Sequence, residues 1–262
     1  MPYAVTAGGG YNVPSFGEVH PDMNATLSRY AISRTSRLRS LALGAAWIVA
    51  GLSCVKPSAA KAPSQEKSQA APVTALPAAN IKDQPLLQLL QLRHTSRDFA
   101  TRPIEAQMLS NLLWAAYGLN RPDGKRTAPS GHDWQYIDVY LADSTGTYRY
   151  EAKGQQLALI RPGDLRSKTG LQDFAATAPV SLIYVNDTRK FPRGTSEEEK
   201  LLFGATTAGA IAQNVYLFCA ANHLNTGVRA DIDRPALHAA MGLAPEQRIL
   251  LAQSVGVPPG AK

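Results

Sequence analysis

A short polar turn, five residues long, is the clearest candidate for chemistry in this sequence. Arg93 and Arg97 flank His94, Thr95 and Ser96, directly after a leucine-rich segment. A guanidinium group offers paired N–H donors that match the oxygens of a phosphate, and the small polar side chains add further donors. The turn therefore predicts a phosphate-binding site. The same pattern also fits a solvated helix end with two surface arginines, because charged residues are common after helices.

Several other kinds of catalytic site are not expected. The sequence has no G-x-S-x-G, H-E-x-x-H or C-x-x-C motif and no Walker A loop. Its one glycine cluster, Gly8–Gly10, lies in the N-terminal segment, which argues against a Rossmann dinucleotide crevice. The five histidines lack the spacing of zinc ligands. Metal catalysis is therefore not expected either.

Four segments, taken in order, resemble motifs of the nitroreductase family. Residues 93–99 (Arg-His-Thr-Ser-Arg-Asp-Phe) resemble its N-terminal flavin-binding turn, and residues 128–135 (Ala-Pro-Ser-Gly-His-Asp-Trp-Gln) resemble its Pro-Ser-x-x-Asn-x-Gln segment. Residues 213–224 are similar to its central helix, and residues 253–258 are similar to its closing strand. No single segment is specific, but the ordered set is.

The four matches cover nearly all of residues 84–258. The loop at 119–126 and the segments at 164–166 and 169–172 are most similar to the branch that contains SagB-type dehydrogenases. The resemblance implies an α+β, three-layer fold with a central, mainly antiparallel sheet flanked by helices. It also implies a homodimer, with the flavin at the subunit interface.

The resemblance implies FMN as the cofactor and gives the matching residues their roles. Arg93 and Thr95 would hold the FMN phosphate. Arg97 would lie near the pyrimidine end of the isoalloxazine, where a fixed cation stabilises the anionic reduced flavin. Pro129 and Ser130 would contact the ring edge through their backbone. The implied cofactor-binding residues are Arg93, His94, Thr95, Arg97, Pro129, Ser130, Asp133, Gln135, Arg229 and Ala230.

Two positions near the flavin ring bear on its redox properties. The main chain of Arg229 and Ala230 would face the flavin N5, where a backbone N–H can donate a hydrogen bond. Asp133 departs from the family, which usually has Asn there. A carboxylate accepts from the flavin N3–H but cannot donate to O4, and its charge opposes an anionic reduced flavin. At the chain end, where relatives often carry basic residues, Lys262 is the available cation.

The function that the resemblance implies is an FMN-dependent oxidoreductase. It would pass hydride from a donor, which can be NAD(P)H, to a small organic acceptor such as a nitro compound or a quinone, in a ping-pong reaction at one flavin face. No side chain is expected to act as a catalytic group, because the flavin carries the chemistry. Two alternatives stay open: a SagB-like dehydrogenase that oxidises an organic substrate without NAD(P)H, and a non-catalytic flavin-binding envelope protein.

The elements that must position these residues are predicted from periodicity and from capping signals. Helices are predicted at 86–92, 105–117 and 197–221 and between Asp233 and Gly242. Strands are predicted at 137–140, 147–150, 180–185, 226–230 and 249–255. The helix at 197–221 is rich in Gly and Ala, which allows close backbone approach. It is therefore expected to be a central packing helix or a dimer contact.

Residues 1–60 indicate an export signal. Arginines at 29–39 precede an apolar run at 41–52 that is too short to span a bilayer comfortably. Cleavage after Ala60 is expected, with lipid attachment at Cys54 as the alternative, and translation is expected to start at Met23. The mature protein is therefore expected in the periplasm, without a stable transmembrane span.

Residues 61–80 lack aromatic residues and are rich in Ala, Pro, Ser, Lys and Gln, which predicts a disordered linker before a domain at 81–262. The chain has a formal charge of +7, but residues 76–262 hold 20 basic and 17 acidic residues. That small excess, without a helix-turn-helix or zinc-finger pattern, makes a nucleic-acid partner unexpected. Cys219 is the one cysteine of the domain, so no internal disulfide is expected.

Overall fold

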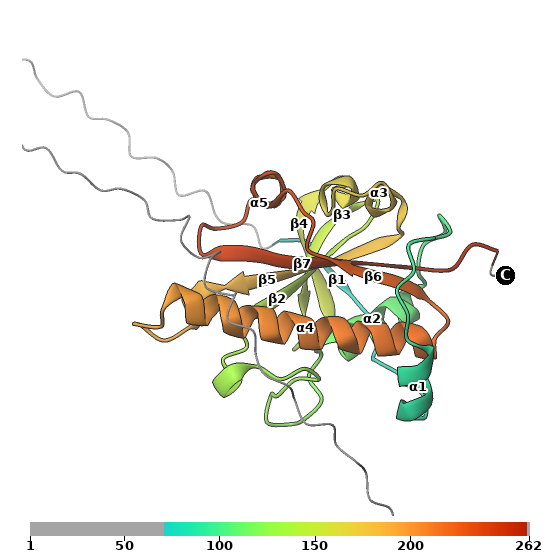
Figure 1. Ribbon diagram of the computed structural model, residues 1–262, viewed down its shortest axis with the longest axis horizontal. Helices are drawn as coiled ribbons and strands as arrows, with labels where there is room; N and C mark the ends of the chain where they lie inside the picture. Colours follow the sequence, from blue (N-terminus) through green and yellow to red (C-terminus); the bar gives the residue numbers. More distant parts are fainter. Residues whose placement is uncertain (1–70, 261–262) are drawn as a thin grey trace, which may run out of the picture. The chain divides into compact units, whose positions relative to one another are not determined.

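A seven-stranded sheet forms the centre of the structure, a computed structural model that describes residues 71–260 (Figure 1). The strand order is β1-β4-β3-β2-β5-β7-β6, and each neighbouring pair is antiparallel. The strands are β1 (Val73–Ala75), β2 (Ile137–Ala142), β3 (Gly146–Glu151), β4 (Gln156–Pro162), β5 (Val180–Asp187), β6 (Asn225–Arg229) and β7 (Gln247–Gly256). The predicted α+β fold with an antiparallel sheet is confirmed.

Helices cover both faces of the sheet and make three layers (Figure 1). On one face lie α2 (Ala106–Tyr117) and α4 (Glu197–Ala221), and on the other lie α3 (Phe174–Thr177) and α5 (Arg234–Met241). The short helix α1 (Leu86–Leu92) contacts α4. Short 3-10 turns occur at Gly131–Asp133, Arg166–Lys168 and Thr188–Lys190.

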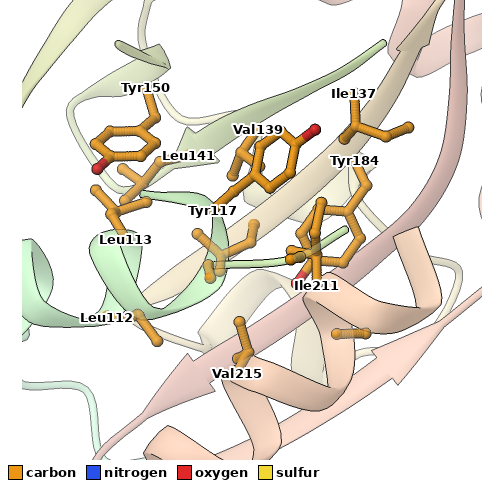
Figure 2. Packing of buried hydrophobic residues seen from close by; sticks show 14 of the residues in the cluster. Leu112, Leu113, Tyr117, Ile137, Val139, Leu141, Tyr150, Tyr184, Ile211 and Val215 are labelled. Carbon is orange, nitrogen blue, oxygen red and sulfur yellow. The ribbon is translucent and has the colours of Figure 1, made fainter. Parts of the chain in front are cut away.

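The two-residue period of the central strands supplies a core to both layers. In β2, Val139 and Leu141 belong to the core beneath α2 and α4, whereas Tyr140 and Ala142 belong to the core beneath α5. Figure 2 shows Val139 and Leu141 in the same cluster as Val215 of α4. All eight residues of β5 are buried, because β5 lies between β2 and β7 and is covered on both faces.

Helix α4 begins and ends at the residues that the sequence predicts. Ser196 caps it through a capping box with Glu199, and three glutamates occupy its first turn, where they complement the helix dipole. A Cβ on Gly204 would lie 2.6 Å from Nδ2 of Asn186, so this glycine allows close packing on β5. Among the described helices α4 alone is long and apolar enough to cross a bilayer, but it packs on the sheet.

Residues 71–80 correct the predicted linker, since they are part of the domain. Val73 in β1 pairs with Ala158 in β4, and the Asn80 N–H donates to Oδ1 of Asn111 at 2.8 Å. Disorder was predicted because the segment lacks aromatic residues. An edge strand is held by backbone hydrogen bonds and needs no large side chains, so composition does not reveal it. The predicted export signal, Cys54 and Lys262 lie outside the described residues.

Candidate functional site

The turn after α1 is fixed against the outer edge of the sheet. β6 is the last strand, so one of its edges has no neighbouring strand. On that edge the Ser96 N–H donates to the carbonyl of Thr226 at 3.0 Å. The hydroxyls of Thr95 and Tyr216 lie 2.8 Å apart, and the Val228 N–H donates to the same Tyr216 hydroxyl at 3.1 Å. One tyrosine of α4 thus joins the turn to β6.

The two arginines of the turn carry charge that no carboxylate neutralises within 71–260. The Arg93 guanidinium lies 5.2 Å from the ring centroid of Tyr216, and that of Arg97 lies 5.9 Å from the ring of Phe174. Neither arginine takes part in the ion pairs found in this part of the chain. His94 is exposed, and its Nδ1 lies 3.0 Å from the Leu92 carbonyl. The turn is therefore an anion-attracting surface, with His94 directed back toward α1.

Gly227 explains how the turn comes so close to β6. A Cβ at this position would lie 3.2 Å from the carbonyl oxygen of Ser96 and 3.4 Å from Cγ2 of Thr95. The first distance is tighter than most carbon contacts, so the Ser96 backbone would have to move to admit a side chain, whereas the second is an ordinary contact. A glycine in an edge strand here marks a close approach of another backbone segment.

The second predicted segment, Pro129–Gln135, is a strained loop beside the middle of α4. The Pro129 carbonyl accepts from the Thr207 hydroxyl at 3.1 Å, and the Ser130 hydroxyl accepts from the Gln135 N–H at 3.1 Å. His132, Asp133 and Gln135 have φ values of 52°, 56° and 49°. Non-glycine residues in this region cost about 1–2 kcal/mol each, so the surrounding contacts must impose this shape.

Side chains of the loop are held from within the same chain. Gln135 Nε2 donates to Asp133 Oδ1 at 3.2 Å and to the Gly124 carbonyl at 3.1 Å. Its Oε1 accepts from Nε of Arg126 at 2.7 Å, and Arg126 also donates to the Tyr117 carbonyl at 2.8 Å. Asp133 is exposed and forms no ion pair among the described residues. Its negative charge therefore stays on the surface of the loop.

The end of β6 presents Arg229 and Ala230 differently. The Arg229 side chain is 6% exposed and points into the interior. Its guanidinium donates to the carbonyl and hydroxyl of Thr169 at 2.9 and 2.6 Å, and to the hydroxyls of Ser254 and Ser181 at 2.7 and 3.1 Å. Burial lowers the pKa of this group to about 10, because desolvation disfavours the charged form. Ala230, the next residue, is exposed.

The two predicted flavin segments contact α4 at different places. The turn at 93–97 contacts Tyr216, whereas Pro129 contacts Thr207, nine residues earlier. Nine residues of helix correspond to about 14 Å along the axis. No hydrogen bond joins the two segments within the described chain. Within one chain, the turn with Arg93, Thr95 and Arg97 therefore lies at the edge of β6, and the loop with Pro129, Ser130, Asp133 and Gln135 lies elsewhere along the helix.

Two cavities lie beside α4. One of about 640 Å³ lies between the N-terminal half of α4, α5 and β7, and its lining includes Ala230, Leu201 and Pro235. The other, of about 730 Å³, lies between α1, α2 and the C-terminal half of α4 and is more polar, with Asn111 and Asn214 in its lining. Residues of the turn at 93–97 line neither cavity. The first cavity is the one that reaches the end of β6.

The residues that anchor the two segments were not predicted from the sequence. Tyr216 holds the turn, and Tyr136 holds the loop by accepting from the Gly131 N–H at 3.0 Å, with its hydroxyl 2.8 Å from that of Thr207. Phe174 lies beside both Arg97 and Arg229. Tyr216 lies inside the predicted helix at 197–221, and Tyr136 directly precedes the predicted strand at 137–140, so a hydroxyl in an otherwise apolar stretch was the available signal.

Comparison with known proteins identifies the family of the chain. A family model described as the nitroreductase family matches residues 90–257. The structure of a candidate nitroreductase from Ralstonia eutropha JMP134 is 38% identical, with a TM-score of 0.69 over 72% of this chain and 90% of that chain. A candidate nitroreductase of Methanocaldococcus jannaschii is 26% identical over 157 residues, which cover 56% of this chain and 79% of that protein.

A more distant structure shares the fold. The NADPH:FMN oxidoreductase of Vibrio harveyi, solved with NAD⁺, has a TM-score of 0.51 at 19% identity, over 66% of this chain and 69% of that chain. The matched family region runs from α1 into the segment after β7, so it includes the turn, the loop and the end of β6. The chain belongs to the nitroreductase family of FMN-dependent oxidoreductases.

Proposed function

We propose that this protein passes hydride between a donor and a small organic acceptor by means of FMN bound along the outer edge of β6. The observation that carries the proposal is the turn at 93–97, which Thr95 and Ser96 hold to that edge and whose two arginines have no carboxylate partner within 71–260. An anionic cofactor would complete such a surface. FMN would supply the redox chemistry, and the chain would supply binding and orientation.

The residues of the turn and of β6 suit this cofactor. Arg93 and Thr95 would hold the phosphate, and Arg97 would lie near the pyrimidine end of the ring. The carbonyl of Thr226 and the N–H of Val228 point to the outer edge of β6, as their bonds to Ser96 and Tyr216 require. By the alternation of an antiparallel strand, the N–H of Ala230 would point the same way, toward the flavin N5.

A second copy of the chain would supply Pro129, Ser130, Asp133 and Gln135. The helix α4 supports this homodimer, because it exposes an apolar stripe that includes Leu202, at 63% exposure, and Gly209. Two such stripes could pack against each other, and the loop of one subunit would then meet the turn of the other. Sedimentation of the FMN-loaded protein as a monomer would contradict this arrangement.

The acceptor would enter through the cavity of about 640 Å³ that reaches Ala230. Its walls include Leu201, Pro235, Ile249 and Leu251, which suits an apolar organic molecule such as a quinone or a nitroaromatic compound. A nicotinamide donor is one candidate for the reductant. The SagB-like alternative, in which an organic substrate is oxidised without NAD(P)H, fits the same site.

Binding of FMN to the full chain is the first test. The purified protein should bind FMN with a stoichiometry of one per chain and quench its fluorescence, and R93Q should weaken that binding, because the phosphate loses a guanidinium partner. R189Q is the matched control, since Arg189 pairs with Asp187 on another part of the surface. Wild-type protein that does not bind FMN would refute the proposal.

Stopped-flow reduction separates the enzymatic alternatives. Rapid bleaching of the bound flavin by NADH or NADPH is expected for the nitroreductase function. Bleaching by an organic donor alone would favour the SagB-like dehydrogenase. Bleaching by neither, together with no activity of D133N, would favour a non-catalytic flavin-binding protein, because Asp133 is the departure that opposes an anionic reduced flavin.

Export to the periplasm, with cleavage after Ala60, remains part of the proposal. Its support is the arginine-rich start and apolar run of residues 29–52. Lipid attachment at Cys54 is the alternative. N-terminal sequencing and mass measurement of the protein from a membrane-free periplasmic fraction would distinguish cleavage from lipidation, and an intact Met1 on cytoplasmic protein would contradict both.

A further inference from the structure

A buried cation, Arg229, lies at the end of β6, the strand along which FMN is proposed to bind. Arg229 is 6% exposed, and its hydrogen bonds all go to neutral acceptors, namely the carbonyl and hydroxyl of Thr169 and the hydroxyls of Ser181 and Ser254. The ion pairs found in residues 71–260 do not include it. The nearest carboxylate in sequence, that of Asp231, accepts from Nε2 of Gln172 and is exposed.

The surrounding residues are arranged for this side chain. A Cβ on Gly170 would lie 2.3 Å from Nε of Arg229, so glycine makes room for the guanidinium. The ring of Phe174 lies 5.5 Å from the Arg229 guanidinium and 5.9 Å from that of Arg97. Two guanidinium groups therefore share one aromatic ring, one of them buried and the other on the turn.

A buried cation without an anion is costly. Desolvation is the cause that lowers the pKa of Arg229, and nearby carboxylates do not offset it. Hydrogen bonds to hydroxyls keep the guanidinium charged but leave its positive field uncompensated. That field acts strongly on nearby groups, because solvent does not screen it in the interior. Reduced FMN, unlike oxidised FMN, carries a negative charge on its ring and would benefit from this field.

We propose that the buried charge of Arg229 makes the site bind reduced FMN more tightly than oxidised FMN. Arg229 would thus be a positioning residue that acts through its electrostatic field. This inference rests on the proposed function, because it requires FMN at the edge of β6. Arg229 does not touch the ring. It acts through the field of its buried charge, while the N–H of the next residue, Ala230, would face the flavin.

The test compares the dissociation constants of oxidised and reduced FMN. Full-length wild type, R229Q and R229K are titrated anaerobically with oxidised FMN and with dithionite-reduced FMN. The preference for reduced FMN is the Kd of oxidised FMN divided by the Kd of reduced FMN. In R229Q this ratio should be at least tenfold lower than in wild type. For a two-electron couple that change corresponds to about 30 mV. R229K keeps the charge and should stay within threefold of wild type.

A matched control removes a nearby cation that, unlike Arg229, is paired with a carboxylate. Arg166 lies on the neighbouring 3-10 turn and pairs with Asp164, whose side chain is 41% exposed. R166Q should leave the ratio within twofold of wild type. A change as large as that of R229Q would mean that any lost charge has this effect, and would overturn the assignment to Arg229.

The remaining outcomes are also decisive. An unchanged ratio in R229Q that binds FMN would overturn the inference while leaving the proposed function intact. An equal loss in R229K and R229Q would assign Arg229 a purely structural role. If R229Q does not fold, R229K decides, because a retained ratio supports the role of charge and a reduced ratio overturns it. Wild-type protein that binds neither form would refute the proposed function itself.

Discussion

Removing the hydroxyl of Tyr216 tests whether the turn at 93–97 must be held to β6 in order to bind FMN. That oxygen contacts the Thr95 hydroxyl and accepts from the Val228 N–H, at 2.8 and 3.1 Å. Two hydrogen bonds at about 1 kcal/mol each make Y216F less stable by about 2 kcal/mol. For a domain of this size the melting temperature should fall by roughly 4–8 °C.

The effect on FMN binding follows from the same bonds. In Y216F the turn is no longer held in place before FMN binds, so binding must order about one additional residue. Ordering it costs about 1–2 kcal/mol, which raises the FMN Kd by roughly 5- to 30-fold. Fluorescence titration of FMN gives the Kd, and calorimetry of the protein without FMN gives the stability.

Y150F is the matched control for this experiment. Tyr150 is 7% exposed, as is Tyr216, and its hydroxyl donates to Gln155 Oε1 at 2.7 Å, on β3 and away from both flavin segments. Y150F should lose about 1 kcal/mol of stability and keep the FMN Kd within about twofold of wild type. Equal FMN affinity in wild type and Y216F, despite the lower melting temperature, would refute the role given to the turn.

Three further predictions concern the scaffold. G170A should lower the free energy of unfolding by about 1–3 kcal/mol in denaturant melts, because its Cβ would displace Arg229. S196A should lower it by about 1 kcal/mol, because α4 loses its capping box. The hydrogen bond from Arg189, the main cause, lowers the pKa of Asp187 below 3.8. The interaction of ionised Asp187 with Arg189 therefore stabilises the fold fully above pH 3.8, and this stabilisation is lost as the pH falls through the lower pKa of the folded state. The difference in free energy of unfolding between wild type and D187N should therefore shrink in acid. A pH-independent deficit would contradict that assignment.

The regular elements were predictable where the signals are local. The bounds of α4 follow from Ser196 at its start and from a long apolar period, and those of α5 follow from Asp233 and from Gly242, whose φ is 66°. β4 and β1 were missed. β1 has three exposed residues, and its pairing with β4 depends on residues more than eighty positions apart in the chain. Such pairing has no local signature.

The candidate site was predictable in part for the same reason. Motif order identified the turn and the loop, since each is a short continuous segment. The contact between Thr95 and Tyr216 spans 121 positions, so it emerges only from the topology. The direction of the Arg229 side chain was also beyond the sequence, because Thr169, Ser181 and Ser254 come from three other parts of the chain. The resemblance gave a role only to the main chain of Arg229, and it gave no information on where the charged side chain lies.

The position of β1 at the border of the sheet limits how far a protease can shorten the N-terminus. The Leu159 N–H donates to the carbonyl of Pro72 at 2.9 Å, so trimming that stops before this residue keeps the whole strand. Trimming beyond Ala75 would uncover the backbone of β4, whose bare amides and carbonyls could pair with another molecule. Protein that has lost β1 to a protease should therefore aggregate. The three exposed residues of β1 thus protect the edge of the sheet from self-association.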